Sequence, residues 1–260
     1  MTRVAVITGA ARGIGAAVAR ALAADGWGLA LGDVCEDDPH LDYPMATYAD
    51  LESVAEECTA AGARVVAFRS DVRRPSDVEA LLDSAAGTGD VTAAVAAAGV
   101  LGGAGPAWQL ADDVVQRDLA VNYVGVVNLA RAAVPRMIAG GHGGRFVAVV
   151  SAAGATGLPL LASYSASKHA ALGFVRSLAA DLAPSGITAN AVLPGSTDTP
   201  LLAATARVYG LSSPQEFARH QRTGRLLTPD EVAAAVRWLC SDQASGITGS
   251  AMQVDGGFTG

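Results

Sequence analysis

Short apolar runs alternate with amphipathic segments along most of the chain. The apolar runs, rich in Val, Ile and Ala, predict buried strands at Arg3–Thr8, Gly28–Asp33, Arg64–Phe68, Val91–Ala97, Arg145–Val150 and Ile187–Val192. Helical spacing of apolar residues predicts helices at Ile14–Asp25, Ala49–Ala61, Ser76–Ala86, Asp112–Ala139, Ser163–Ala183 and Pro229–Leu239. Because the crossover helices must cover both faces of the sheet, this order predicts a single doubly wound α/β domain with a parallel sheet.

Two segments interrupt the alternation. Residues 36–46 are acidic and contain two prolines, which indicates an inserted loop, whereas residues 196–227 mix apolar and charged positions as substrate lids do. Thr47 with Asp50 predicts a capped helix start, and Pro75-Ser76 with Glu79 predicts another. Ligands of doubly wound sheets bind at the carboxyl ends of the strands, so function is expected there.

Composition narrows the classes of partner. The 260 residues are 51% hydrophobic and 17% charged, with a net charge of −7, which argues against nucleic acid and anionic membranes. Glycine and proline in the uncharged stretches 91–111 and 146–167 indicate a buried strand and loop rather than a membrane span. Three cysteines and four scattered histidines predict neither disulfides nor a metal site, and no export signal is visible, so we expect a cytoplasmic protein.

A glycine-rich turn follows the first strand. Gly9, Gly13 and Gly15 lie where the backbone must approach a ligand closely, and the helix that follows offers free amides to a pyrophosphate. The spacing also occurs in turns without ligands. Asp33 ends the second strand, where a carboxylate hydrogen-bonds the adenosine ribose and repels a 2′-phosphate. Arg12 could instead accept the extra phosphate of NADP, but Asp33 is closer, so the sequence favours NAD.

Tyr164 and Lys168 form the candidate chemical pair. Residues four apart share one helix face, so the ammonium can lie beside the phenol. Ser151 follows the preceding strand and reaches the same end of the sheet. A cation near a phenol, together with the positive ring of the cofactor, favours phenolate and makes the phenol a proton donor and acceptor.

These motifs, with Asp71-Val72, Asn122, Pro194-Gly195 and Val254–Gly257, occur in an order that resembles the short-chain dehydrogenase/reductase family. The resemblance covers essentially the whole chain and implies a Rossmann-like domain with a seven-stranded sheet. It implies cofactor contacts at Gly9, Arg12, Gly13, Ile14, Gly15, Asp33, Asp71, Val72, Ala98, Gly99, Tyr164, Lys168, Pro194, Thr197 and Thr199. One departure is that Ala96-Ala97-Ala98-Gly99 replaces the family's Asn-Asn-Ala-Gly, which leaves the rigidity of this segment open.

The resemblance also implies the role of each residue. Tyr164 would be the general acid/base, Lys168 would bind the ribose hydroxyls and the phenol, and Ser151 would hold the substrate oxygen. Asn122 would anchor a water of the proton relay. Asp71 and Val72 would contact adenine, and Thr197 and Thr199 would border the nicotinamide amide and the phosphate.

The acidic insert and the segment 194–199 resemble, more narrowly, the mycofactocin-associated branch of the family. In that branch the insert covers a tightly held NAD, which exchanges hydride with a peptide-derived carrier; the alternative is a loop-length variant of an ordinary dehydrogenase. The family's habits imply a homotetramer, for which small residues on the long helix are candidate contacts: Ala120, Ala130, Ala132 and Ala133.

We therefore expect an NAD-linked oxidoreductase that interconverts a secondary alcohol and its ketone. Apolar residues near the site favour a hydrophobic substrate, namely Leu158, Leu160, Leu161, Leu201, Leu202 and Trp108. An NADPH-dependent ketoacyl-carrier-protein reductase is one alternative, against which Asp33 and the net charge argue. A non-enzymatic dinucleotide sensor on the same fold is the other.

Overall fold

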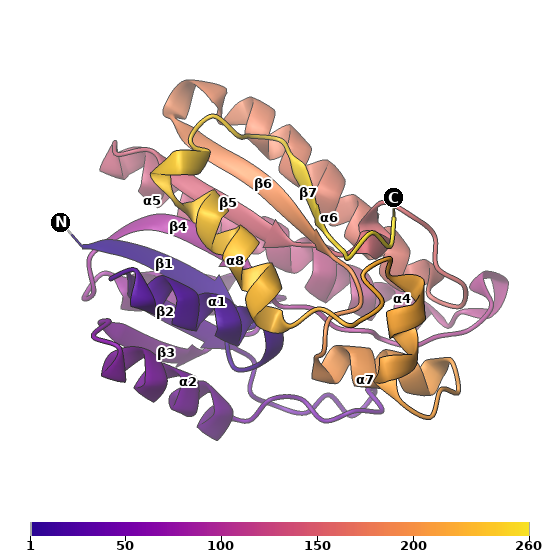
Figure 1. Ribbon diagram of the computed structural model, residues 1–260. Helices are drawn as coiled ribbons and strands as arrows, with labels where there is room; N and C mark the ends of the chain where they lie inside the picture. The colour runs from indigo at the N-terminus through magenta and orange to yellow at the C-terminus, as the bar shows by residue number, and fades with distance from the viewer. Residues whose placement is uncertain (1, 260) are drawn as a thin grey trace.

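The computed structural model describes residues 2–259, which form a seven-stranded parallel sheet in the order β3-β2-β1-β4-β5-β6-β7 (Figure 1). This confirms the predicted fold class. The strands are β1 (Arg3–Thr8), β2 (Gly28–Asp33), β3 (Val65–Arg69), β4 (Asp90–Ala96), β5 (Gly144–Val149), β6 (Ile187–Pro194) and β7 (Ala251–Val254). Six agree with the sequence pattern to within two residues, and the short β7 completes the sheet beside β6.

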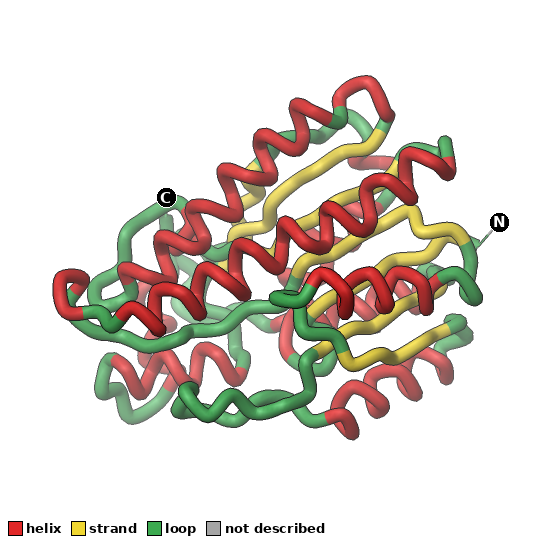
Figure 2. Tube along the Cα trace, turned by 180° about the vertical axis from the view of Figure 1, so that it is seen from behind, coloured by secondary structure: helices red, strands yellow, loops and turns green. Residues whose placement is uncertain are grey.

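Helices cover both faces of the sheet. On one face lie α1 (Gly13–Ala24), α2 (Tyr48–Ala60) and α8 (Pro229–Cys240), seen in front in Figure 1. On the other face lie α3 (Pro75–Ala85), α5 (Gly125–Gly140) and α6 (Ala162–Asp181), seen in front in Figure 2. Strands buried on both faces need apolar side chains at every position, which explains their continuous rather than alternating pattern.

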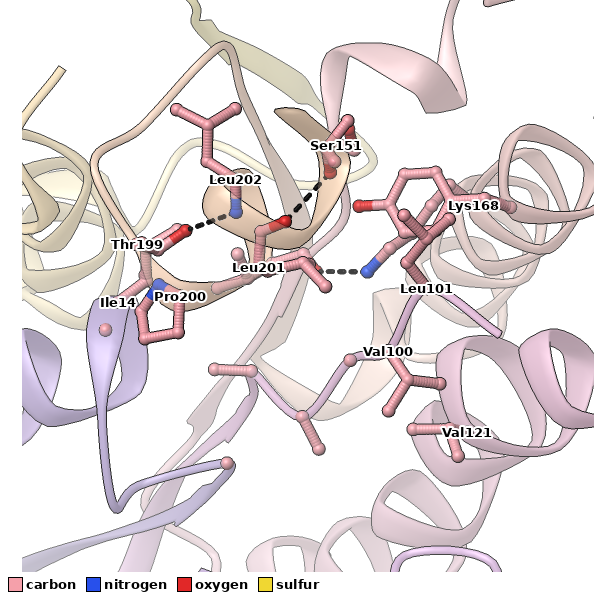
Figure 3. A pocket seen from close by; sticks show the side chains of 18 of the residues that line it. Ile14, Val100, Leu101, Val121, Ser151, Lys168, Thr199, Pro200, Leu201 and Leu202 are labelled. Atoms are coloured by element: carbon pink, nitrogen blue, oxygen red, sulfur yellow. Dashed lines mark hydrogen bonds between the residues drawn. The ribbon is translucent and has the colours of Figure 1, made fainter. Parts of the chain in front are cut away.

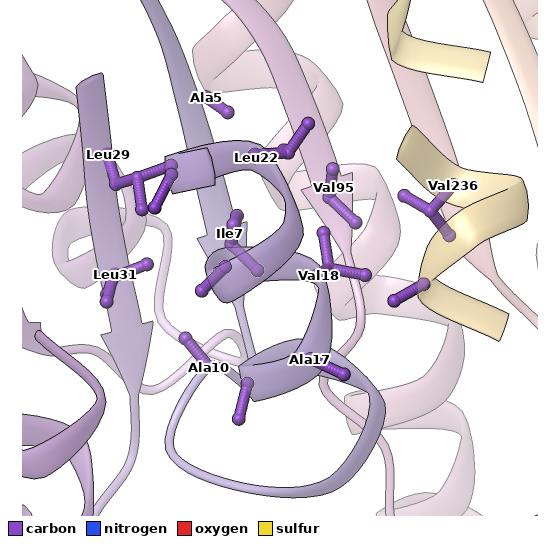
Figure 4. Packing of buried hydrophobic residues seen from close by; sticks show 14 of the residues in the cluster. Ala5, Ile7, Ala10, Ala17, Val18, Leu22, Leu29, Leu31, Val95 and Val236 are labelled. Atoms are coloured by element: carbon purple, nitrogen blue, oxygen red, sulfur yellow. The ribbon is translucent and has the colours of Figure 1, made fainter. Parts of the chain in front are cut away.

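Small side chains bring the helices close to the sheet. Figure 4 shows Val18 and Leu22 of α1 between Ile7 of β1 and Val236 of α8, all of them fully buried. Three of the alanines proposed for subunit contacts pack in the same way on the other face: Ala130, Ala132 and Ala133 are between 0% and 4% exposed. The prediction that these three residues form subunit contacts was wrong, because they are buried within the chain itself.

The long helix predicted at Asp112–Ala139 is interrupted. It consists of α4 (Asp112–Leu119), a π-helical turn (Ala120–Val124) and α5. A π turn bonds i to i+5, which periodicity over a long window does not reveal. The turn carries Asn122 into the interior, where it is 1% exposed.

Helix starts follow the predictions in part. Thr47 and Asp50 form a capping box at α2, as expected. The helix α3 begins at Pro75, one residue from the predicted start, but the cap predicted from Pro75-Ser76 with Glu79 was wrong, because no side chain caps this helix. The pre-set φ of a first-turn proline accounts for that start without a cap. Within residues 2–259, no helix is both long and apolar enough to cross a membrane.

Candidate active site

A cavity of about 920 Å³ opens at the carboxyl ends of the strands. Every predicted cofactor residue lines it, as do Ser151, Tyr164 and Lys168. Figure 3 shows Ser151 and Lys168 on one side of this cavity and Ile14, Thr199 and Pro200 on the other. Asn122 does not line the cavity but lies buried behind it.

The glycine turn between β1 and α1 closes one end of the cavity. Gly9 has a φ of +68°, and a Cβ there would lie 2.6 Å from the backbone of Ala98. A Cβ on Gly15 would lie 2.0 Å from the carbonyl oxygen of Gly9. Arg12 caps α1 without a side-chain hydrogen bond to its first amides, which therefore stay available to an anion. This backbone cradle fits a pyrophosphate.

Asp33 ends β2 at the edge of the cavity and is 9% exposed. Its carboxylate accepts hydrogen bonds from the amides of Ala11 at 3.1 Å and Cys35 at 3.5 Å. Burial raises the pKa of Asp33, while these amides and the charge of Arg12 oppose that rise. Arg12 donates to the carbonyl of Pro44 at 2.8 Å, so its guanidinium is engaged by the insert.

Asp71 lies at the adenine end of the predicted cofactor site. Arg73 donates to both of its carboxylate oxygens, at 2.7 to 3.0 Å. Burial acts to raise the pKa of Asp71, but the hydrogen bonds and charge of Arg73 hold it below its ordinary value. Thr199 caps the helix α7 (Pro200–Val208) by accepting a hydrogen bond from the amide of Leu202 (Figure 3).

Tyr164 and Lys168 meet on α6 as their spacing predicts. The ammonium lies 5.6 Å from the centre of the Tyr164 ring and donates to the carbonyl of Val149 at 3.3 Å. Burial raises the pKa of Tyr164 to about 12, against the effect of the Ser151 hydroxyl. Burial lowers the pKa of Lys168 to about 8, close to the range in which enzymes operate. Lys168 is also the only lysine in the sequence.

The segment after β4, where the family's amide side chains are missing, is braced by other means. The Val100 amide donates to Asn122 Oδ1 and its carbonyl accepts from Asn122 Nδ2, both at 2.9 Å. The next two amides, of Leu101 and Gly102, donate to the Tyr43 hydroxyl at 2.9 Å and to Asp118 Oδ1 at 2.7 Å. Three side chains from three segments therefore fix residues 100–102, which we call the braced loop.

Residues of the segment 36–46 line the cavity, as Asp33 does, and contacts with other parts of the chain hold this segment at several points. Asp38 pairs with Arg73 and Arg117, each at 3.6 Å, and Arg207 of α7 donates to the carbonyl of Asp42 at 3.5 Å. The segment 196–227 folds into α7 and a 3₁₀ helix, Pro214–His220. Both Tyr209 of this segment and Pro159 line the cavity, and the Tyr209 hydroxyl donates to the carbonyl of Pro159 at 2.6 Å.

The predicted apolar wall needs two corrections. Leu158, Leu161, Leu201 and Leu202 line the cavity, but Trp108 and Leu160 do not and are 84% and 38% exposed. Trp108 stands on a short 3₁₀ turn and Leu160 has a φ of +62°, and neither conformation follows from residue type. The sequence pattern also missed lining residues from the lid and the carboxyl end: Tyr209, Leu211, Phe217, Arg219, His220 and Phe258.

A dinucleotide fits these residues. The glycine cradle leaves room for a pyrophosphate, Asp33 offers a carboxylate to a ribose, and Lys168 lies beside the Tyr164 ring in the same cavity. No group of three His, Cys, Asp or Glu residues able to hold a metal ion occurs in the part of the chain that the structure describes. Fold and site together define a dinucleotide-dependent oxidoreductase.

Comparisons with known proteins narrow this class. The family model described as enoyl-(acyl carrier protein) reductase matches residues 9–259. The cis-4-hydroxycyclohexanecarboxylate dehydrogenase of Sinomonas cyclohexanicum is 39% identical over 99% of this chain and 96% of its own. The (-)-trans-carveol dehydrogenase of Rhodococcus erythropolis is 34% identical over 99% and 97%. Carveol dehydrogenase from Mycobacterium avium, solved with NAD, is 30% identical with a TM-score of 0.94, over 98% of this chain and 97% of that one.

The chain belongs to the short-chain dehydrogenase/reductase family. It is therefore a short-chain dehydrogenase/reductase enzyme, as the sequence predicted, and the sensor alternative is set aside. The NAD in the similar structure agrees with the predicted cofactor.

Proposed function

We propose that this enzyme uses NAD to oxidise a hydrophobic cyclic secondary alcohol to its ketone, and catalyses the reverse reaction. The observation that carries the proposal is the juxtaposition of Ser151, Tyr164 and Lys168 at the apolar end of the cavity. Leu158, Leu161 and Leu201 suit a compact apolar ring system, and the cyclic alcohols named for two relatives support the same class of substrate.

Each side chain has a defined task in this proposal. When bound, NAD supplies the acceptor for the hydride. The Ser151 hydroxyl donates a hydrogen bond to the substrate oxygen, and the Tyr164 phenolate takes the hydroxyl proton as the carbonyl forms. Lys168 stays protonated beside Tyr164 and stabilises the phenolate, because a nearby positive charge favours the anionic form. In the reverse reaction Tyr164 returns the proton to the carbonyl oxygen.

The phenol of Tyr164 needs help to ionise. With its pKa raised to about 12 by burial, the side chain is protonated at neutral pH in the cofactor-free enzyme. Positive charge at the nicotinamide end would lower this pKa toward the operating range. Asn122, whose two polar side-chain groups bond Val100 and Ser167, is proposed to hold the relay region in place.

Replacing Tyr164 by Phe tests the proposal. The variant keeps the ring but loses the transferable proton, so kcat with a cyclic alcohol should fall by about 10² to 10⁴. Binding of NADH should be retained. Tyr123→Phe, which alters a tyrosine packed edge-on against Phe174 away from the cavity, is the matched control and should retain activity. Turnover of Tyr164→Phe within tenfold of wild type would show that another group moves the proton.

We propose further that the insert slows cofactor release, as expected for the mycofactocin-associated branch. The contacts of Asp38, Asp42 and Tyr43 with other parts of the chain support this, because contacts made over a bound cofactor lower its off-rate more than its on-rate. NAD should then copurify, and external NAD should support little turnover unless an artificial acceptor reoxidises bound NADH in place. A peptide-derived redox carrier would be the physiological acceptor.

The insert is tested by measuring release of bound NADH by fluorescence after dilution. Shortening residues 36–46 to a simple turn should speed release and restore exchange with external NAD. Thermal unfolding of the shortened chain checks that the fold is intact. Equal, fast release from both proteins would leave an ordinary NAD-dependent alcohol dehydrogenase with a longer loop.

A ketoacyl-carrier-protein reductase using NADPH finds less support. Asp33 stands where a 2′-phosphate would need a cation, and Arg12 is engaged by Pro44. We also propose a cytoplasmic homotetramer, for which light scattering of the purified enzyme is the direct test of assembly.

A further inference from the structure

Asp118 is a buried carboxylate that the mechanism above does not use. It lies on α4, is 0% exposed, and accepts a hydrogen bond from the Gly102 amide at 2.7 Å through Oδ1. Its other oxygen, Oδ2, has no hydrogen-bond partner among the described residues. A carboxylate buried in this state is costly unless opposite charge or polar groups face it. Its surroundings therefore decide what it does.

The helix α4, which carries Asp118, packs against α6, and polar or charged groups from four parts of the chain interact electrostatically with this carboxylate. Lys168 and Ser163 come from α6, Arg117 precedes it on α4, and the Gly102 amide comes from the braced loop. Tyr43 of the insert and Tyr164 of α6 are close enough for the negative charge to act on them. Burial raises the pKa of Asp118, whereas the Gly102 amide and the charges of Lys168 and Arg117 oppose that rise.

The nearer cation in sequence is not its partner. Arg117 is engaged elsewhere, with Asp38 at 3.6 Å, Asp113 at 3.3 Å and the carbonyl of Gly102 at 3.4 Å. Lys168 forms no ion pair with a carboxylate among the described residues, and the charge of Asp118 raises its pKa against the effect of burial. The charge of Asp118 thus acts on the proposed catalytic pair, Tyr164 and Lys168.

We propose that Asp118 is a positioning residue for the proton-transfer pair, which fixes the braced loop through Gly102 and sets by its charge the pH range in which Lys168 and Tyr164 work. The inference rests on the proposed roles of those two side chains. Ser151, which follows β5, is uncharged, whereas the charge of Asp118 acts on both Tyr164 and Lys168.

The direction of the effect follows from the sign of the charge. A neighbouring carboxylate favours the ammonium of Lys168 and disfavours the phenolate of Tyr164, so it raises the pKa of both. Removing the charge should lower both values together. The whole pH profile of kcat then moves to lower pH, whereas a merely structural loss would reduce its height without moving it.

Two substitutions separate the charge from the hydrogen bond. Asp118→Asn keeps an oxygen that accepts from Gly102 but removes the charge, and Asp118→Ala removes both. Asp113→Asn is the matched control, because it removes a carboxylate from the same helix whose side chain is 60% exposed and therefore screened by water.

The single lysine of the chain permits a direct reading without cofactor or substrate. Protein labelled with ¹³C at lysine Cε gives one lysine signal, whose titration reports Lys168 alone. Its midpoint should lie near pH 8 in wild type, lower in both Asp118 variants, and unchanged in Asp113→Asn. In steady-state assays, kcat at alkaline pH relative to neutral pH should fall several-fold in Asp118→Asn and remain at the wild-type ratio in Asp113→Asn.

An unchanged lysine titration in Asp118→Asn would overturn the inference. If the Asp118 variants do not fold, the protonation state of Asp118 in the wild-type enzyme is measured instead, from its labelled carboxyl signal. A carboxyl group that stays protonated throughout the active pH range also overturns the inference. Failure of the proposed function is detected by a different result, namely an active Tyr164→Phe enzyme.

Discussion

Two loops that line the cavity are held in place by different means. The glycine turn at residues 8–15 is fixed by its own backbone, because Gly9 and Gly15 allow contacts that any side chain would block. The braced loop at 100–102 is fixed by Asn122, Tyr43 and Asp118, which reach it from elsewhere. Backbone sterics thus shape the cofactor end, and side-chain hydrogen bonds shape the catalytic end.

Among changes that test this comparison of the two loops, the largest effect should come from disturbing the glycine turn. In Gly15→Ala the new Cβ would lie 2.0 Å from a carbonyl oxygen, so the turn must shift. We expect a cost of about 3 kcal/mol, on the order of a hundredfold in NADH affinity. Fluorescence titration with NADH measures it. Gly173→Ala is the control: it lies in α6 with open space around it and should raise stability by about 0.5–1 kcal/mol. Equal affinities in the two variants would contradict the steric account.

Removing Asn122 should release the braced loop. Asn122→Ala leaves the amide and carbonyl of Val100 buried without partners, which costs about 2 kcal/mol of unfolding free energy. Because Gly99 packs against Lys168, kcat should fall as well. Urea unfolding and hydrogen exchange at Val100 measure the two consequences. Unchanged protection of the Val100 amide would mean that other groups hold the loop.

Replacing Asp33 should alter cofactor choice rather than the fold. Asp33→Ala removes an acceptor for the ribose and a charge that repels a 2′-phosphate, so the preference for NADH over NADPH should fall several-fold. Titration calorimetry with both cofactors measures the ratio. Tighter binding of NADPH than of NADH by the wild-type enzyme would show that Asp33 has been assigned the wrong role.

The smallest effect should come from Tyr43→Phe. The variant keeps the buried ring but loses the acceptor for the Leu101 amide, worth about 1 kcal/mol, or about a fivefold faster release of NADH. Stopped-flow fluorescence measures the rate. Tyr48→Phe is the control: Tyr48 lies in α2, where the guanidinium of Arg69 stacks over its ring, and this variant should release NADH at the wild-type rate. If Tyr43→Phe releases NADH at the wild-type rate, the hydrogen bond between the insert and the braced loop does not control cofactor release.

The same contrast explains what could be predicted from sequence. The glycine turn, the ends of the strands and the Tyr164–Lys168 pair depend on neighbours within a few residues, so local spacing indicated them. The partners of the braced loop lie 22, 58 and 16 residues away in the chain, and no periodicity relates them. Asp118 was missed for this reason, since a carboxylate on an amphipathic helix ordinarily faces water.

The alanines of α5 and the exposed Trp108 show that residue type alone does not predict which way a side chain points. Residue type indicated a small or apolar surface, but which way each side chain points depends on how the helix or loop is seated on the sheet. Ala132 and Ala133 face inward and Trp108 faces solvent, and only the folded arrangement distinguishes these outcomes.

The π turn at Ala120–Val124 makes the site sensitive to chain length. One residue more than an α-helical turn is accommodated between α4 and α5, and each helical residue corresponds to a rotation of about 100°. Deleting a single residue there would allow an unbroken α-helix. If α5 stayed packed on the sheet, α4 would rotate about its axis and Asp118 would turn away from Gly102. A helix that is more regular, with unchanged helical content by circular dichroism, would thus belong to a less active enzyme.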